Sequence, residues 1–391
     1  MRGVMTWSAK RRARTSLLAA LVAVAGSAAA CGSDNADPAP QAARDHLSSC
    51  FKVGHVDSIA GLNAFVSRLR GDPSFAGGDV GASVDLQDRR QLFVFGDTLR
   101  GASFPGQKFV RNSMLVFTQQ CGWAVLPADG GAVIPDREDG VGYWPMSIAR
   151  VHRPGYDLVG VGCQRVRSTG EGGVFGFEIL GPAFAKFVIP TGGTPELVST
   201  TDIGPDLVDT RKPMWGAAAV VDHGWVYAYG TARPPGAGLQ GFSLQVARTR
   251  PDSVTSPSTW RYWTGSAWSL HPGNAKVLIP SEGGVSQTLS VFQQGGRWYA
   301  VSKKDEVLGT DLTIWTAPAP TGPFTAATTA AKIPSDAATG TLRYMPLAHP
   351  DLLPEPGTVV VSYSRNNTDF SLVQQDPRRY RPRFLRIRLP R

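Results

Sequence analysis

Short apolar, β-rich runs alternate along this chain with polar clusters of Gly, Pro, Asp and Asn. The β-rich runs predict strands, and the clusters that separate them predict turns. Helical periodicity is nearly absent; it is found in residues 55–70, where apolar residues recur at spacings of three and four. The sequence therefore predicts an all-β fold with one short helix, which means a sandwich, a barrel or a propeller.

One kind of strand recurs through the chain, an apolar run that ends in small or polar residues. It occurs at residues 92–97, 157–162, 225–230, 298–302 and 359–363. The ends of successive copies lie 65, 68, 72 and 60 residues apart, and self-similarity at a long period is typical of repeat architectures. Five units of this length predict a five-bladed β-propeller with four strands in each blade. A β-sandwich in which this spacing arises by chance is the alternative.

Two aspartates lie in the first repeat. Asp79 lies between glycines ahead of a strand expected at residues 82–86, and Asp97 follows the apolar run at residues 92–95. The turn at residues 88–90 joins these strands into a hairpin, so both carboxylates, 18 positions apart, are expected at one end of a sheet. A carboxylate at the end of a buried strand costs free energy unless it has a partner or a function. Each aspartate alone also fits a turn or cap residue.

In a propeller the innermost strand of each blade lines a central channel, so residues near the strand ends share one cavity. Several repeats supply further polar and aromatic residues that we expect there. These substrate-binding candidates are Arg111, Asn112, Trp144, Trp215, Gln287, Tyr344, His349, Arg365 and Asn366. Aromatic faces are good platforms for sugar rings, although each tryptophan separately also fits a core position. His349, which precedes a proline, also fits a turn.

The start of the chain has the pattern of an export signal. Basic residues are followed by an apolar run at 17–25 and by small residues directly before Cys31. This pattern resembles a bacterial lipoprotein signal with lipidation of the Cys31 thiol; ordinary secretion is the alternative. The apolar run is too short to span a membrane. We expect a signal peptide at residues 1–30, a flexible tether at 31–45 and the propeller at 46–391, held at the cell envelope by its lipid anchor.

The charge distribution argues against a nucleic-acid partner. The formal net charge is +9, but five basic residues lie in the expected signal peptide, and its removal leaves +4. Seven arginines crowd the last fifteen positions, so the body between is close to neutral. The basic face that nucleic-acid binding needs is therefore missing. We expect the arginine-rich end to be a solvated face of a last strand; contact with an anionic polymer or lipid head groups is the alternative.

Cysteine and histidine usage narrows the chemistry. With Cys31 lipidated, Cys50, Cys121 and Cys163 allow one disulfide and one free thiol. We favour the Cys50–Cys121 pair, which ties the segment before the propeller to the first blade.

The six histidines are scattered, which argues against a catalytic transition-metal site. No cofactor is expected, and the sequence leaves a structural calcium ion open. Signatures of metalloproteases, serine hydrolases and phosphate-binding loops are missing.

The order of several short motifs resembles a family of bacterial propellers, that of domain of unknown function 4185. The likeness opens with Gly78-Asp79 and Phe95-Gly96-Asp97-Thr98 and spans nearly all of residues 75–389. Other matching motifs are Val110-Arg111-Asn112-Ser113, Trp225-Val226-Tyr227-Ala228-Tyr229-Gly230, Ile314-Trp315-Thr316-Ala317, Gly322-Pro323-Phe324 and Tyr380-Arg381-Pro382-Arg383-Phe384. Each motif alone has low specificity, but their order and spacing together are specific.

This resemblance implies a glycoside hydrolase-like propeller, because the family resembles five-bladed glycoside hydrolases and includes endo-D-arabinanases acting on mycobacterial arabinan. Two aspartates matching Asp79 and Asp97 are the implied catalytic pair. Glycosidic cleavage needs one carboxylic acid to protonate the leaving oxygen and one carboxylate to activate water or attack carbon. Asp97 is the favoured acid because its strand looks more buried. We expect cleavage of arabinan or another envelope glycan; a non-catalytic propeller that binds glycan or protein is the alternative.

Overall fold

The computed structural model describes residues 47–68, 73–171, 176–234, 241–306 and 309–391. The expected signal peptide and the lipidation site Cys31 lie outside the described residues, as does all of the tether, so these stay predictions. All described residues belong to one compact unit. None of the helices in the described ranges is long and apolar enough to cross a membrane.

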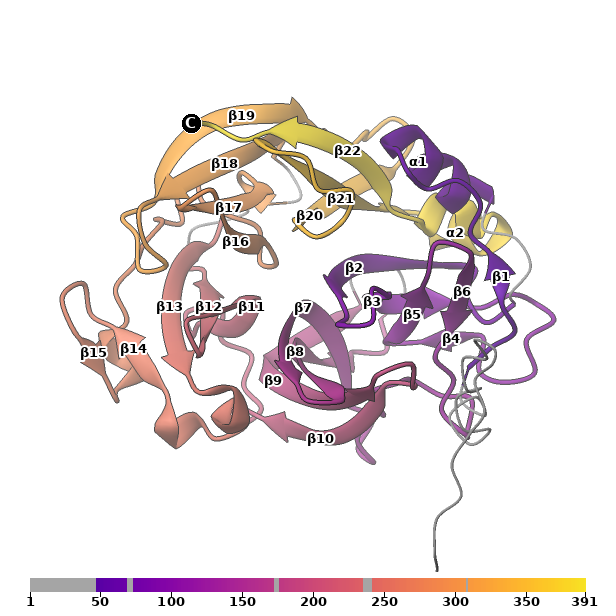
Figure 1. Cartoon of the computed structure of the whole chain (residues 1–391), viewed down its shortest axis with the longest axis horizontal. Coiled ribbons are helices and arrows are strands. Elements are labelled where there is room, and N and C mark those ends of the chain that lie inside the picture. The colour runs from indigo at the N-terminus through magenta and orange to yellow at the C-terminus, as the bar shows by residue number, and fades with distance from the viewer. Residues whose placement is uncertain (1–46, 69–72, 172–175, 235–240, 307–308) are drawn as a thin grey trace, which may run out of the picture. The chain divides into compact units, whose positions relative to one another are not determined.

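Five antiparallel sheets follow one another around a common centre (Figure 1). The first strand along the chain is the innermost strand of each sheet, apart from the short β1 of the first sheet. The innermost strands are β2 (Gly77–Asp85), β7 (Gly142–Arg153), β11 (Met214–Asp222), β16 (Ser290–Gln294) and β20 (Thr341–His349). Each contacts the innermost strand of the next sheet, and β20 contacts β2 to close the ring. The fold is therefore the predicted five-bladed β-propeller.

The first blade carries both aspartates. Outward from β2 lie β3 (Gln91–Leu99), β5 (Ser113–Phe117), β6 (Cys121–Ala124) and β1 (Phe51–Lys52), while β4 (Phe109–Val110) pairs with β3. The predicted hairpin of β2 and β3 is confirmed, with Val84 opposite Leu92 and Asp85 opposite Gln91. Leu92 and Val94 are fully buried, as the apolar run requires. The hairpin therefore holds Asp79 on β2 beside Asp97 on β3.

Within the described ranges the five sheets contain six, four, five, four and three strands, so the expectation of four strands in every blade is wrong. The remaining strands are β8 (Tyr156–Ser168), β9 (Phe177–Pro190) and β10 (Glu196–Asp202) in the second blade; β12 (Trp225–Ala232), β13 (Ser243–Thr249), β14 (Arg261–Trp263) and β15 (Trp268–Ser269) in the third; β17 (Arg297–Lys303), β18 (Asp311–Ala317) and β19 (Thr325–Lys332) in the fourth; and β21 (Thr358–Asn367) and β22 (Arg383–Arg388) in the fifth. The recurring apolar strand is the second strand of each blade, which pairs along both edges.

Short helices lie outside the sheets. α1 (Ile59–Arg68) falls inside the predicted helical range, buries Leu62 and Val66, and contacts β22. The others are α2 (Phe370–Gln375) and the 3-10 helices η2 (Pro251–Ser253), η3 (Pro257–Thr259), η4 (Pro272–Asn274) and η6 (Pro377–Tyr380). Asp376 caps η6, because its side chain accepts a hydrogen bond from the backbone N–H of Arg378.

Hydrogen bonds between residues far apart in sequence join the first and last blades. Asn63 on α1 donates from Nδ2 to the carbonyl oxygen of Phe384 at 2.8 Å, and its Oδ1 accepts from the Phe384 N–H at 2.9 Å. Arg381 donates from Nε to the carbonyl oxygen of Ala76 at 2.7 Å. The first and last elements of the described chain are thus fixed to each other.

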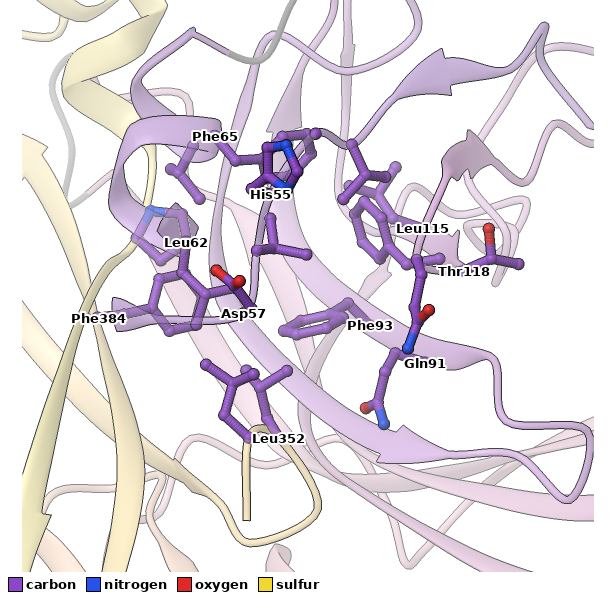
Figure 2. A pocket seen from close by; sticks show the side chains of 18 of the residues that line it. His55, Asp57, Leu62, Phe65, Gln91, Phe93, Leu115, Thr118, Leu352 and Phe384 are labelled. Carbon is purple, nitrogen blue, oxygen red and sulfur yellow. The ribbon is translucent and has the colours of Figure 1, made fainter. Parts of the chain in front are cut away.

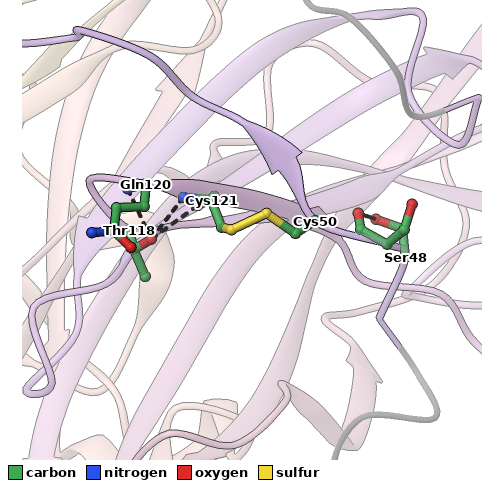
Figure 3. The surroundings of a disulfide bond; sticks show 6 residues. Ser48, Cys50, Thr118, Gln120 and Cys121 are labelled. Atoms are coloured by element: carbon green, nitrogen blue, oxygen red, sulfur yellow. Dashed lines mark hydrogen bonds between the residues drawn. A yellow bond between two sulfur atoms is a disulfide. The ribbon is translucent and has the colours of Figure 1, made fainter.

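A disulfide fixes the segment that precedes the propeller. Cys50 is bonded to Cys121 on β6, with the two Cα atoms 5.4 Å apart, so the favoured pairing is confirmed (Figure 3). Thr118 beside it accepts hydrogen bonds through Oγ1 from the backbone N–H groups of Gln120 and Cys121. Cys163 is a buried free thiol, and burial raises its pKa above the ordinary value, so it stays protonated.

Candidate functional site

Four of the five innermost strands are distorted near their starts. The register of strand pairing shifts between residues 78 and 82 in β2, 145 and 147 in β7, 215 and 218 in β11, and 344 and 347 in β20. A bulge re-aims the side chains next to it and is frequent beside functional sites. The predicted residues Asp79, Trp144, Trp215 and Tyr344 all lie at these bulges, one from each blade.

Asp79 is partly exposed, and several hydrogen-bond donors hold its carboxylate. Its Oδ2 accepts a hydrogen bond from the hydroxyl of Tyr344 at 2.8 Å, and the Tyr380 hydroxyl and the backbone N–H of Asp97 also donate to it. Burial raises the pKa of Asp79 to about 6, and these hydrogen bonds oppose the rise because they stabilise the charged form. The carboxyl group is therefore poised to gain or lose a proton slightly below neutral pH.

Asp97 lies next to Asp79 and has a different environment. Its Oδ1 accepts a hydrogen bond from the indole Nε1 of Trp144 at 2.6 Å. Burial raises its pKa well above the ordinary value, and the negative charge of Asp79 raises it further. The Trp144 hydrogen bond and the positive charge of Arg111 oppose this rise. Of the two carboxyl groups, Asp97 thus has the more strongly raised pKa.

Unusual backbone conformations place Asp79 against β3. Val80 has φ of 65°, which is an outlier for a β-branched residue and costs about 1–3 kcal/mol. Its N–H donates to Ser364 Oγ on β21 at 2.9 Å, which helps to fix this conformation. On the facing strand, a Cβ atom added to Gly96 would lie 2.5 Å from Asp79 Oδ1. Glycine is needed at residue 96 because the Asp79 carboxylate occupies that space.

Two tyrosines from the last part of the chain complete the surroundings of Asp79. The hydroxyl of Tyr344 donates to Asp79 and accepts a hydrogen bond from the predicted residue Asn366. Burial and the charge of Asp79 hold the pKa values of Tyr344 and Tyr380 well above their ordinary range, so both hydroxyls remain donors at neutral pH. The sequence analysis did not single out Tyr380, which occurred there only as the first residue of one of the family motifs.

Arg365 fixes Tyr380 rather than reaching the aspartates. Its Nε donates to the carbonyl oxygen of Arg381 at 2.9 Å and its Nη2 to that of Arg378 at 2.8 Å. These carbonyls lie on either side of Tyr380 in the chain, so the guanidinium holds η6 in place. The predicted residue Arg365 is therefore a positioning residue in this structure.

Arg111 and Asn112 organise the loop that leads into β7. Arg111 Nε forms an ion pair with Asp136 Oδ2 at 3.2 Å. Asn112 is fully buried; it donates to the carbonyl oxygens of Ile134 and Tyr143 and accepts from the Ile134 N–H. Because Tyr143 directly precedes Trp144, these bonds fix the indole that contacts Asp97. Asp136, a further carboxylate near Asp97, was missed by the sequence analysis.

Three predicted residues have other partners. Trp215 is buried and packs against Tyr262, with ring centres 5.2 Å apart. The backbone N–H of Gln287 donates to Glu306 Oε2 at 2.8 Å. His349 is buried between two serine hydroxyls, each 2.7 Å from one ring nitrogen, and burial lowers its pKa to about 3. His349 is thus a neutral core histidine, and the structure does not bring it to the carboxylate pair.

Groups of three or more His, Cys, Asp and Glu side chains that could hold a metal ion are not found in the described part of the chain. The groups that the structure brings together at the site are the two carboxyl groups and the hydrogen-bond donors around them. A protonated carboxylic acid beside an ionised carboxylate can give a proton on one side of a bond and take one on the other.

The fold and the site together define the class of protein: a five-bladed β-propeller with an adjacent pair of aspartates on its first blade. Within this class, the chain belongs to the family of domain of unknown function DUF5005, whose profile matches residues 61–389. The resemblance to domain of unknown function 4185 is not confirmed, because the matching family is a different one. The sequence matches no curated protein.

Several solved structures, from bacteria and a fungus, superpose on this chain. A candidate hydrolase from Bacteroides ovatus superposes with a TM-score of 0.61 at 18% identity, covering 84% of this chain and 89% of its own. An α-L-arabinofuranosidase from Podospora anserina, in complex with cellotriose, gives 0.45 at 10% identity, with 81% and 91% covered. An α-L-arabinanase from Cellvibrio cellulosa gives 0.42 at 11% identity, with 80% and 92% covered. The first of these likenesses supports the fold assignment.

Proposed function

We propose that this protein is a glycoside hydrolase in which Asp97 is the general acid and Asp79 the general base or nucleophile. The observation that carries the proposal is the adjacent pair of partly exposed carboxyl groups with unequal proton affinity. Burial and the charge of Asp79 raise the pKa of Asp97 well above the ordinary value, while the pKa of Asp79 is about 6. Glycosidic cleavage needs one protonated and one ionised carboxyl group at the same pH.

The hydrogen bonds at the pair assign a role to each oxygen atom. The indole N–H of Trp144 can only donate, so the Asp97 Oδ1 that it contacts is an acceptor. The proton of neutral Asp97 is then carried on Oδ2, from which it passes to the leaving glycosidic oxygen. The hydroxyls of Tyr344 and Tyr380 keep Asp79 ionised, so that it can activate water or attack the anomeric carbon.

The proposed substrate is arabinan or another glycan of the cell envelope. The resemblance of the motif order to a family with endo-D-arabinanases favours arabinan, and the expected lipoprotein signal would hold the enzyme at the membrane surface near such a polymer. Lipidation of Cys31 and location in the envelope are part of the same proposal.

Product release from glycans tests the reaction. Protein lacking the expected signal peptide is incubated with arabinan and with a panel of other envelope glycans, beside the variants Asp79→Asn and Asp97→Asn. We expect oligosaccharides from the wild type and a loss of about 100-fold or more in each variant, as removal of a general acid or base costs. The matched control is Asp222→Asn, which changes an aspartate at the other end of an innermost strand, where its partner is His223.

Two outcomes would contradict the hydrolase. Binding of a glycan by the wild type without any cleavage across the panel would favour the non-catalytic binding propeller. Cleavage that survives in a folded Asp97→Asn variant would remove Asp97 from the reaction. Circular dichroism and thermal unfolding of each variant exclude loss of fold as the cause.

A further inference from the structure

A cavity of about 530 Å³ lies between helix α1 and the face of the first blade (Figure 2), and neither Asp79 nor Asp97 lines it. Its walls are mainly aromatic and aliphatic, and they come from α1, from β3, β5 and β22, and from the loops that follow β1, β5 and β20. The wall residues that matter here are Leu62, Phe65, Phe93, Leu115, Phe117 and Phe384. The volume is within the range of small-molecule sites, about 300–1,000 Å³.

The cavity is open to solvent on one side, because His55, Asp57 and Arg89 on its lining are exposed. Water fills a cavity well when it finds two to four polar partners per molecule, and rings and aliphatic side chains offer none. An apolar ligand matches these walls.

Polar side chains of the lining lie mainly at the rim, and the buried Arg381 is the exception. His55, Asp57, Arg89, Gln91 and Thr118 line the cavity, and His55, Asp57 and Arg89 are exposed. In Figure 2, Gln91 and Thr118 lie on one side of the Phe93 ring and Asp57 on the other. Arg89 lies two residues before Gln91, in the turn between β2 and β3.

Arg89 is a cation at the rim whose side chain has no partner within the described structure. No hydrogen bond or ion pair of its side chain is found among the described residues, and its φ of 66° presents it from a tight turn. Arg381 also lines the cavity, but its guanidinium donates to the carbonyl oxygens of Ala76 and Val66. An arginine at the mouth of an apolar cavity matches a ligand with an acidic head group and an apolar body.

We propose that this cavity binds an amphiphile with one unbranched aliphatic chain and an anionic head group, of the fatty acid class. The aliphatic chain lies among Phe65, Phe93 and Phe117, and the carboxylate lies at the rim beside Arg89. Binding forms no covalent bond and needs no cofactor. This site is separate from the proposed glycosidase site, so a failure of either proposal leaves the other standing.

Displacement of a fluorescent fatty acid tests the site. The probe is dansyl-labelled undecanoic acid, whose emission rises in apolar surroundings, and the competitors are dodecanoate, dodecanol and a lysophosphatidylglycerol with a dodecanoyl chain. We expect saturable, one-to-one binding of the probe and its displacement by dodecanoate more strongly than by dodecanol. Displacement by the lysophospholipid as strong as by dodecanoate would identify membrane lipid as the source of the chain; weaker displacement would identify free fatty acid.

Substitutions on α1 and in the turn locate the bound probe. Leu62→Trp places a larger ring in the cavity and should weaken probe binding at least tenfold, whereas Ala60→Trp, on an exposed position of the same helix, should leave it unchanged. If Leu62→Trp does not fold, Val66→Phe from the same wall replaces it. Arg89→Gly should weaken dodecanoate about fivefold and leave dodecanol unchanged, because only the acid meets the guanidinium.

The proposal is overturned if the probe does not bind the wild type, if Leu62→Trp binds it as the wild type does, or if Ala60→Trp loses it equally. Equal competition by dodecanoate and dodecanol in the wild type would remove the acidic head group from the proposal. The Asp97→Asn variant should bind the probe normally, which separates this test from that of the hydrolase.

Discussion

Asp79 and Asp97 are the same amino acid, yet their surroundings give their carboxyl groups different chemistry. Asp79 receives hydrogen bonds from tyrosine hydroxyls that stabilise its charge. Asp97 receives one indole hydrogen bond and lies beside the charge of Asp79. Because opposite effects act on neighbouring groups, the pair is expected to hold one proton over a range of pH around neutrality.

The pH dependence of the proposed reaction follows from these shifts. Asp79 acts while ionised and its pKa is about 6, so kcat/KM should fall as the pH drops through about 6. Asp97 acts while protonated and its pKa is raised, so activity should also fall on the alkaline side, which gives a bell-shaped profile. Tyr344→Phe removes a hydrogen bond that favours the charged form of Asp79, and should move the acidic limb upward by roughly one unit.

Initial rates on the cleaved glycan between pH 4 and pH 9 would measure this profile for both proteins. The variant Tyr363→Phe, whose tyrosine lies on β21 away from these bonds, serves as the control. An acidic limb that does not move in Tyr344→Phe would show that Asp79 is not the group titrating there.

Gly96 is expected to be indispensable for the position of Asp79. In Gly96→Ala the new methyl group would lie 2.5 Å from Asp79 Oδ1 and would displace the carboxylate. A displacement of about 1 Å in an active site can cost about 100-fold in rate, so we expect kcat to fall by about that factor. Gly160→Ala is the matched control, because Gly160 lies on the second strand of the second blade and no atom lies within 4 Å of an added Cβ. Equal activity of the two variants would contradict the tight contact.

At the scale of elements, strands with a continuous apolar pattern were predictable from the sequence. Elements that are positioned by contacts between distant residues were not. The five repeats were visible because the second strand of each blade is buried and keeps a continuous apolar run, as in Leu92 to Phe95. Outer strands such as β1 and β15 have two residues each and leave no such pattern, so the number of strands per blade was not predictable. Tyr380 joins the site from a 3-10 helix 301 positions after Asp79, and no local pattern marks it.

Helix η6 depends on Arg365 for its position. Arg365→Ala removes two hydrogen bonds to the carbonyls around Tyr380, and the loss of bonds to a charged donor should cost about 2–4 kcal/mol of unfolding free energy. A less fixed Tyr380 should also weaken its hydrogen bond to Asp79 and lower kcat about tenfold. Urea denaturation and rate measurements check both. Arg378→Ala is the control: its ion pair with Asp376 is mainly exposed, so less than about 1 kcal/mol should be lost.

At the scale of the whole molecule, side chains reinforce the closure of the ring where the first and last blades meet. The fifth blade has three strands, and its outer strand β22 would present unpaired backbone groups at Phe384. Asn63 on α1 pairs with both the N–H and the carbonyl of that residue. An edge covered in this way is protected from pairing with other chains.

The closure predicts a specific loss of stability. Asn63→Ala leaves two backbone groups of Phe384 without their partner and should lower the free energy of unfolding by about 1–3 kcal/mol, with increased aggregation on heating. The control is Asn274→Ala in the third blade, where the side chain makes one exposed hydrogen bond to Ser269. Urea denaturation and light scattering measure the two effects. Equal stabilities of the two variants would show that the ring closes without Asn63.

The pairing of Asp79 with Tyr344 and Tyr380 also sets the order in which the site can be assembled during synthesis. The hairpin with both aspartates leaves the ribosome long before the tyrosines that hold Asp79, which lie 265 and 301 positions later. A nascent or truncated copy that ends before residue 380 has both carboxylates but cannot hold them as the complete ring does. In the proposed hydrolase, catalytic competence therefore marks a finished chain.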